Sequence, residues 1–167
     1  SAYGAVVSVT TAEANAQRRG ASIDIEGGYR GPMAVKVQRD TTKARAEAQV
    51  HRAMSACGAP VPGFGWSGTA RGVRVTAMER VDGITLDKYI AMHGTAGVYE
   101  GRTLEALDVL RACGLARHGD LHPGNVIITP SGNIVIIDFG DARMGAWSKG
   151  MNTEQFQRIV QSDVLLA

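Results

Sequence analysis

The segment HGDLHPGN, residues 118–125, places two histidines, an aspartate and an asparagine within one short stretch. His118, Asp120 and His122 alternate, so on a strand they would share one face and could bind a metal ion such as zinc. The proline and glycine that follow turn the chain, which indicates a loop between a helix and a hairpin rather than a strand. A metal site would also leave Asn125 without a role. The segment is therefore interpreted as the working loop of an enzyme.

A second acidic motif, IDFG, follows at the end of two apolar runs. The runs NVIIT and NIVIID are joined by PSGN and predict a β-hairpin. A hairpin brings its ends together, so we expect Asp120, Asn125 and Asp138 to converge. Two carboxylates and an amide in one small volume require a cation between them. Such oxygen ligands suit Mg²⁺, which proteins usually hold with one or two carboxylates and phosphate oxygens.

The elements that must position these residues fall into two groups. Strands are predicted in AVVSV after Gly4, in PMAVKVQ and in GVRVTAMERV. Helices are predicted over residues 40–57, 86–93, 103–116 and 152–166. Residues 11–31 show no clear periodicity, and APVPGFGWSG is predicted to be a loop with at most a strand edge. Asn152 and Gln155 are placed to cap the last helix. The order predicts a two-lobed α+β domain.

Composition limits the class of protein. With 44% apolar residues, 20% charged residues and a net charge of +2, the chain is typical of a soluble globular domain. Its basic residues are scattered, which argues against a nucleic-acid partner. We expect no membrane-spanning segment and no signal peptide, hence no membrane partner and a cytoplasmic location. Cys57 and Cys113 lack metal or redox spacing and are predicted to be buried free thiols in a reducing compartment.

Taken together, AVKV, HGDLHPGN and DFG resemble the motifs of the protein kinase family over nearly the whole chain. The resemblance implies that Lys36 contacts the α- and β-phosphates of ATP. Apart from Asp40, which can cap its start, Glu47 is the only carboxylate on the following predicted helix and therefore the one candidate to pair with Lys36. Asp120 would accept the proton of the substrate hydroxyl, while Asn125 and Asp138 would hold Mg²⁺. The implied fold has a reduced N-lobe, residues 1–81, with a β-sheet and one helix, and a truncated, mainly helical C-lobe, residues 82–167.

The resemblance also implies an adenine site. MERVDG is similar to a kinase hinge, whose backbone would hydrogen-bond the base through Glu79 and Val81. SAYGAV resembles the end of a glycine-rich loop, although the earlier glycines of that loop are not in this chain. The residues implied to surround the adenine are Gly4, Val6, Ala34, Met78, Glu79, Val81 and Ile127.

Two departures bear on the substrate. Gly119 stands where most protein kinases have arginine, and His122 where they have lysine; His122 could reach the transferred phosphate. The loop is also similar to that of aminoglycoside and choline phosphotransferases, whereas Phe139 and Gly140 favour the protein kinase side. No APE-like motif follows. The expected function is ATP- and Mg²⁺-dependent phosphorylation of a serine or threonine in a protein substrate. A small-molecule kinase and an ATP-binding pseudokinase scaffold are the alternatives.

Overall fold

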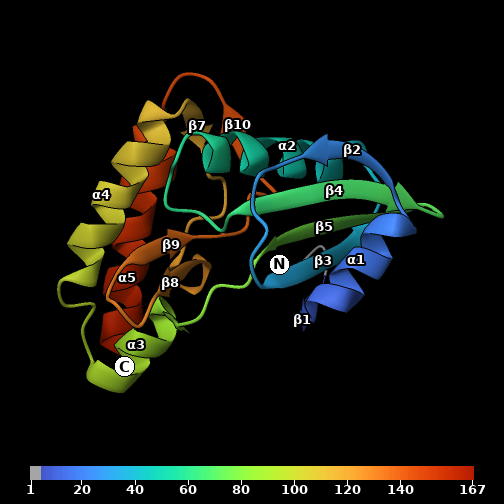
Figure 1. Cartoon of the computed structure of the whole chain (residues 1–167). Helices are drawn as coiled ribbons and strands as arrows, with labels where there is room; N and C mark the ends of the chain where they lie inside the picture. The colour runs from blue at the N-terminus through green and yellow to red at the C-terminus, as the bar shows by residue number, and fades with distance from the viewer. Residues whose placement is uncertain (1–4) are drawn as a thin grey trace.

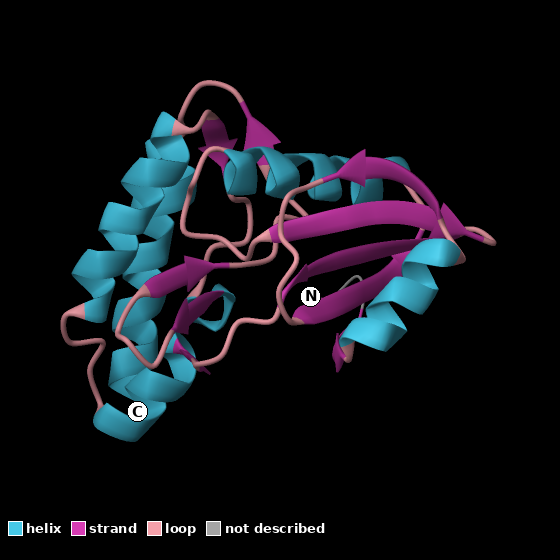
Figure 2. Cartoon of the chain, in the orientation of Figure 1, coloured by secondary structure: helices cyan, strands magenta, loops and turns pink. Residues whose placement is uncertain are grey.

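The computed structural model describes residues 5–167, and Gly4 of the predicted adenine site lies outside this range. The described chain is a mixed α/β structure with a five-stranded antiparallel sheet followed by a helix-rich half, consistent with a kinase-like fold (Figures 1 and 2). Among the described residues, no helix is both long and apolar enough to cross a membrane.

The large sheet has the strand order β1-β3-β5-β4-β2, and all its pairs are antiparallel. Its strands are β1 (Ala5–Val9), β2 (Ser22–Glu26), β3 (Met33–Arg39), β4 (Phe64–Ala70) and β5 (Val73–Glu79). The predictions of β1, β3 and β5 from their β-branched residues are confirmed. Helix α2 (Thr42–Ala56) packs against the sheet, with Ala48 in an apolar cluster with Ile25 and Phe64.

Residues 11–26, in which the sequence shows no clear periodicity, form α1 (Thr11–Arg19) and then β2, so two elements were missed here. The missed signal is a cap: the Thr10 hydroxyl accepts a hydrogen bond from the backbone N–H of Glu13 at 3.1 Å. In β2 the alternation of Ile23 and Ile25 is too short to stand out between polar neighbours.

The prediction of a loop, possibly with a strand edge, at APVPGFGWSG holds for residues 59–63 but is wrong from Phe64 on, because β4 is a full strand between β5 and β2. Its glycines allow close backbone approach. A Cβ on Gly65 would lie 2.9 Å from the carbonyl oxygen of Ala77, and one on Gly68 would lie 2.6 Å from that of Ser22. Glycine here marks crowding between strands and not a turn.

The second half of the chain encloses the largest apolar cluster, which includes Leu86, Leu107, Leu110 and Phe156. Its helices are α3 (Leu86–His93), α4 (Tyr99–Ala112) and α5 (Gln155–Leu166). The predicted hairpin is confirmed as β8 (Val126–Ile128) and β9 (Ile134–Ile136), with β6 (Ile84–Thr85) beside β8. A further pair joins β7 (Leu115–Arg117) to β10 (Arg143–Met144).

Asn152 does not cap α5, contrary to the sequence prediction. It lies in a π-helical turn, Gly150–Glu154, before that helix, and its side chain is fully buried. Its amide donates to the carbonyl oxygens of Ser148, at 2.6 Å, and Ala116, at 3.1 Å, and accepts from the backbone N–H of His118 at 2.8 Å. Asn152 therefore stabilises the start of the HGDLHPGN loop.

The prediction of free thiols is wrong, because Cys57 and Cys113 form a disulfide. Cys57 ends α2 and Cys113 ends α4, so the bond joins two helix ends that are 56 residues apart in the chain. Such a long-range meeting of helix ends leaves no trace in cysteine spacing. The cysteines therefore no longer support the predicted reducing compartment.

Candidate nucleotide and phosphoryl-transfer site

A cleft of about 340 Å³ lies at one end of the large sheet, where β3 and β5 face the β8–β9 hairpin. Every described residue of the predicted adenine site lines it: Val6, Ala34, Met78, Glu79, Val81 and Ile127. Lys36, Glu47 and Asp138 line the same cleft. The structure thus brings the residues predicted for base and phosphates into one space.

Lys36 lies in the middle of β3 and is 97% buried, since its relative exposure is only 3%. The alternation of β3 places Val35 in the apolar core and turns Lys36 to the opposite face, toward α2. There Glu47 meets it, with 2.6 Å between Nζ and Oε2. The Lys36 Nζ also lies 4.0 Å from Oδ1 of Asp138. A buried ammonium between two carboxylates is held in one place and presents its remaining donors to the cleft.

The HGDLHPGN loop brings Asp120, His122 and Asn125 together. The side-chain amide of Asn125 donates to the backbone oxygen of Asp120 at 2.8 Å and lies 3.4 Å from its Oδ2. The backbone N–H of Gly124 donates to Nδ1 of His122 at 3.0 Å, and Nε2 of His122 lies 3.2 Å from the side-chain amide nitrogen of Asn125 and 3.7 Å from Oδ2 of Asp120. His122 and Asp120 are both partly exposed, as groups that meet a substrate must be.

Asp138 joins this cluster through the hairpin. Its neighbour Ile137 donates its N–H to the backbone oxygen of Asn125 at 3.0 Å, which ties the end of β9 to the loop. Asp138 has φ +66°, a left-handed conformation that is uncommon for a residue with a side chain. Gly140 donates its N–H to Oδ1 of Asp138 at 3.3 Å. Such backbone strain is concentrated at functional sites.

The residues present fit a magnesium ion. Because the Asn125 amide nitrogen faces the Asp120 carbonyl, its oxygen Oδ1 is left without a hydrogen-bond donor among residues 5–167, and Asn125 is 6% exposed. That oxygen and the Asp138 carboxylate are hard ligands of the kind Mg²⁺ prefers. No group of three or more His, Cys, Asp or Glu side chains in the described chain could hold a metal ion. A hard cation here would therefore complete its coordination with phosphate oxygens or water.

Four rings form a row of contacts at the wall of the cleft, from β4 through α2 to the loop. The His51 ring meets that of Phe64 edge-on at 5.2 Å and stacks on that of Phe139 at 5.7 Å, and Phe139 lies tilted to His118 at 5.3 Å. Burial lowers the pKa of His51 to about 4, although its hydrogen bond to the Pro62 carbonyl opposes this. Burial also lowers the pKa of His118. Both imidazoles are neutral at pH 7. His118 is fully buried, where its Nδ1 accepts from the backbone N–H of Asp120 at 3.3 Å and its Nε2 bonds the Ile137 carbonyl at 2.7 Å.

The proposed hinge backbone is partly occupied. The N–H of Glu79 donates to the Gly63 carbonyl at 2.8 Å, and its side chain accepts from the Gly63 N–H at 3.0 Å. The N–H of Val81 has no acceptor within residues 5–167. Of these two amides, only that of Val81 is available to a ligand.

Gly119 has a structural reason to be glycine. Its φ is +89°, and a Cβ there would lie 2.3 Å from the backbone oxygen of Asp141. The loop and the segment after DFG approach too closely for any side chain at this position. The backbone conformation at this position therefore explains why the residue is glycine and not arginine.

The comparisons with known proteins agree with this geometry. Residues 101–148 match the phosphotransferase enzyme family. The chain is 33% identical over 90 residues to protein ACTIVITY OF BC1 COMPLEX KINASE 3, chloroplastic, from Arabidopsis thaliana, covering 48% of this chain and 11% of that protein. The chain is kinase-like. The kinase-like chain is also 37% identical over 71 residues to serine/threonine-protein kinase PknA of Mycobacterium tuberculosis, covering 40% of this chain and 16% of PknA.

The same identity over 71 residues relates the kinase-like chain to the probable serine/threonine-protein kinase PknB of Lactococcus lactis, covering 40% of this chain and 11% of PknB. The chain thus spans well under a fifth of the length of each of these relatives.

Several lining residues were not predicted from the sequence. They are Ser8, His51, Pro62, Arg80, Ile137 and Phe139. His51 could have been found, because it lies four residues after Glu47 and so shares its helix face. Pro62 and Ile137 line the cleft from loops, and no local sequence pattern predicts where those loops run.

Proposed function

We propose that this chain transfers the γ-phosphate of ATP, with Mg²⁺, to the hydroxyl of serine or threonine in a protein. The observation that carries the proposal is the convergence of Lys36, Glu47 and Asp138 in one cleft, with the Asp120–Asn125 loop tied to its lining residue Ile137 by a backbone hydrogen bond. We further propose that residues 1–81 and 82–167 act as two lobes with the nucleotide between them.

Each polar group has a distinct task in this proposal. Lys36 binds the α- and β-phosphates, and Glu47 fixes the ammonium in position. Asp138 and Oδ1 of Asn125 would hold Mg²⁺, which when bound neutralises charge on the β- and γ-phosphates. Asp120 accepts the proton of the incoming hydroxyl. Phosphoryl transfer depends mainly on such positioning and charge stabilisation.

His122 adds a further polar group to this set. Its imidazole lies beside the Asp120 carboxylate and is partly exposed, so it can reach a phosphoryl oxygen during transfer. The base is held by the free N–H of Val81, between Val6 and Ala34 on one side and Ile127 on the other, with Met78 behind it.

The protein substrate is supported by the names of the relatives PknA and PknB, which are serine/threonine-protein kinases. The match of residues 101–148 to the phosphotransferase enzyme family favours a second candidate, a kinase of small alcohols. A scaffold that binds ATP without transferring phosphate is the third. The three differ in where label from ATP should appear.

The test is transfer from γ-labelled ATP with Mg²⁺, offered a cell extract in one set of reactions and aminoglycosides and choline in another. Wild type is compared with Asp120→Asn and with Asp108→Asn, an exposed aspartate on α4, as the matched control. Label in protein that appears with wild type and Asp108→Asn but not Asp120→Asn supports the proposal. Label in a small molecule transfers support to the second candidate. Nucleotide binding without any label contradicts catalysis and favours the scaffold.

A further inference from the structure

Arg74 of β5 is among the most buried side chains of the protein, at 1% exposed, yet it lines no part of the cleft. Its guanidinium binds Asp24 with both terminal nitrogens, at 2.9 and 2.8 Å, and donates from Nε to Asp40 at 3.1 Å. A further bond reaches Oγ of Ser67 at 3.0 Å. The hydrogen bond from Arg74 lowers the pKa of Asp24, and the same bond raises the pKa of Arg74.

The two carboxylates come from different elements. Asp24 lies on β2, and Asp40 lies between the end of β3 and the start of α2. Asp40 is held further by its N–H, which donates to the Gly72 carbonyl at 2.9 Å, and Thr41 then caps α2. Arg74 therefore connects the α1–β2 segment, the centre of the sheet and the link between β3 and α2.

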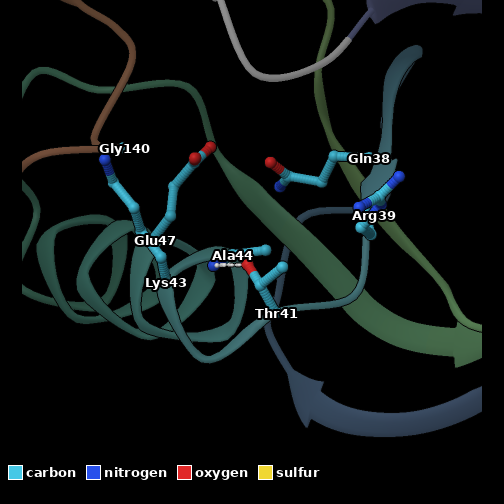
Figure 3. A pocket seen from close by; sticks show the side chains of 7 residues that line it. All are labelled: Gln38, Arg39, Thr41, Lys43, Ala44, Glu47 and Gly140. Carbon is cyan, nitrogen blue, oxygen red and sulfur yellow. Dashed lines mark hydrogen bonds between the residues drawn. The ribbon is translucent and has the colours of Figure 1, made fainter.

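Two ion pairs with partly exposed side chains also hold the first turns of α2: Lys43 lies 2.6 Å from Asp141, and Arg45 lies 3.9 Å from Asp24. A pocket of about 150 Å³ separates these turns from the end of β3. Figure 3 shows the side chains of Gln38 and Glu47 pointing toward one another across this pocket, and no hydrogen bond joins them. The apolar contact of Ala48 with Ile25 and Phe64 lies further along the helix. The hydrogen bonds of Arg74 add an attachment at the start of α2 that is made by a buried side chain.

We propose that Arg74 is a positioning residue for the Lys36–Glu47 pair, and that Asp24 of the α1–β2 segment is part of the same device. Asp40 fixes where α2 begins, and Glu47 projects from the second turn of that helix. Without the guanidinium, the carboxylates of Asp24 and Asp40, which are 31% and 35% exposed, would lose the cation between them, and their repulsion would move the start of α2. The role of the pair in phosphoryl transfer rests on the proposed function; the control of α2 by Arg74 does not.

The experiment combines kinetics with hydrogen exchange on Arg74→Lys, which keeps the charge but not the fork, and on Asp40→Ala, which leaves Arg74 paired with Asp24. Arg158→Lys, an exposed site on α5, is the matched control. In both test variants, amide exchange should accelerate in residues 42–47 and stay unchanged in α4. kcat should fall about ten- to hundredfold, as when a catalytic group is displaced by ~1 Å, with little change in stability-corrected nucleotide binding.

The decisive measurement is a double-mutant cycle with Glu47→Gln. If Arg74 acts through Glu47, then Arg74→Lys should lower kcat little further once Glu47 has been replaced. Losses that multiply would overturn the proposal, as would unchanged exchange in residues 42–47. If wild type transfers no phosphate at all, the proposed function fails, and the exchange of residues 42–47 against that of α4 still decides whether Arg74 positions α2.

Discussion

The Cys57–Cys113 disulfide should contribute strongly to stability, because it restrains a long loop of the unfolded chain. The bond spans 56 residues. In the chain-entropy account, closing a loop of that length removes about 14 cal/mol/K from the unfolded state, or about 4 kcal/mol at 25 °C. This is a large part of the ~5–15 kcal/mol that stabilises a typical domain. We therefore expect the double variant Cys57→Ala, Cys113→Ala to lose about 4 kcal/mol in its free energy of unfolding.

The assay is urea unfolding of oxidised and reduced wild type beside the double variant, with thiols counted before and after denaturation. Reductant should lower the unfolding midpoint of wild type and leave that of the double variant unchanged. Denatured wild type that shows two free thiols without reductant would refute the disulfide itself. Coincident curves for oxidised and reduced protein would refute the entropic argument while leaving the bond in place.

Three further predictions concern groups near the site. Folding lowers the pKa of His51 to about 4, so the unfolded chain binds more protons than the folded chain below about pH 6.5. The free energy of unfolding should therefore fall as the pH drops from about 6.5 to 4, by at most about 3 kcal/mol. The variant His51→Phe should flatten the dependence of the melting temperature on pH. Gly119→Ala should cost about 2 kcal/mol in urea unfolding, because its Cβ would lie 2.3 Å from a carbonyl oxygen at a positive φ, whereas Gly101→Ala in α4, with open space around it, should be neutral or stabilising. Asn152→Ala should cost about 3 kcal/mol, since it leaves buried backbone groups without partners, and should lower kcat by loosening the HGDLHPGN loop; a stability loss below 1 kcal/mol would contradict that role.

The helices and strands that could be predicted from the sequence are those whose structure is determined by their own residues and by the turns beside them. Helix α3 and the β8–β9 hairpin were predicted because apolar runs end at clear turn residues. β4 was missed because its glycines were assigned to a loop. They are glycines because the neighbouring strands approach too closely for a Cβ, which a local sequence pattern does not reveal. α1 was missed because its residues are mostly polar and only one is buried, so no apolar stripe forms.

The candidate site divides in the same way. Lys36 was identifiable because a lysine in an apolar strand demands a partner, and Glu47 was the sole acid on the next helix. The tertiary contacts could not be identified from the sequence. They are the disulfide, the buried hydrogen bonds of Asn152, and the hydrogen bonds from Arg74 to Asp24 over a separation of 50 residues. Each joins elements whose meeting is decided by the whole fold.

The row of four rings at the wall of the cleft has a consequence for inhibitors. His51 and His118 remain neutral because Phe139 and its neighbours keep water from them. A small molecule that pulls Phe139 outward would hydrate both imidazoles, return their affinity for protons toward that of free histidine, and take up protons as it binds. By linkage, such a compound would bind more tightly in mildly acidic solution, whereas one that leaves Phe139 in the row would show no such dependence from this source. Measuring the affinity of each ligand as a function of pH would therefore show whether that ligand displaces Phe139 or leaves it in place.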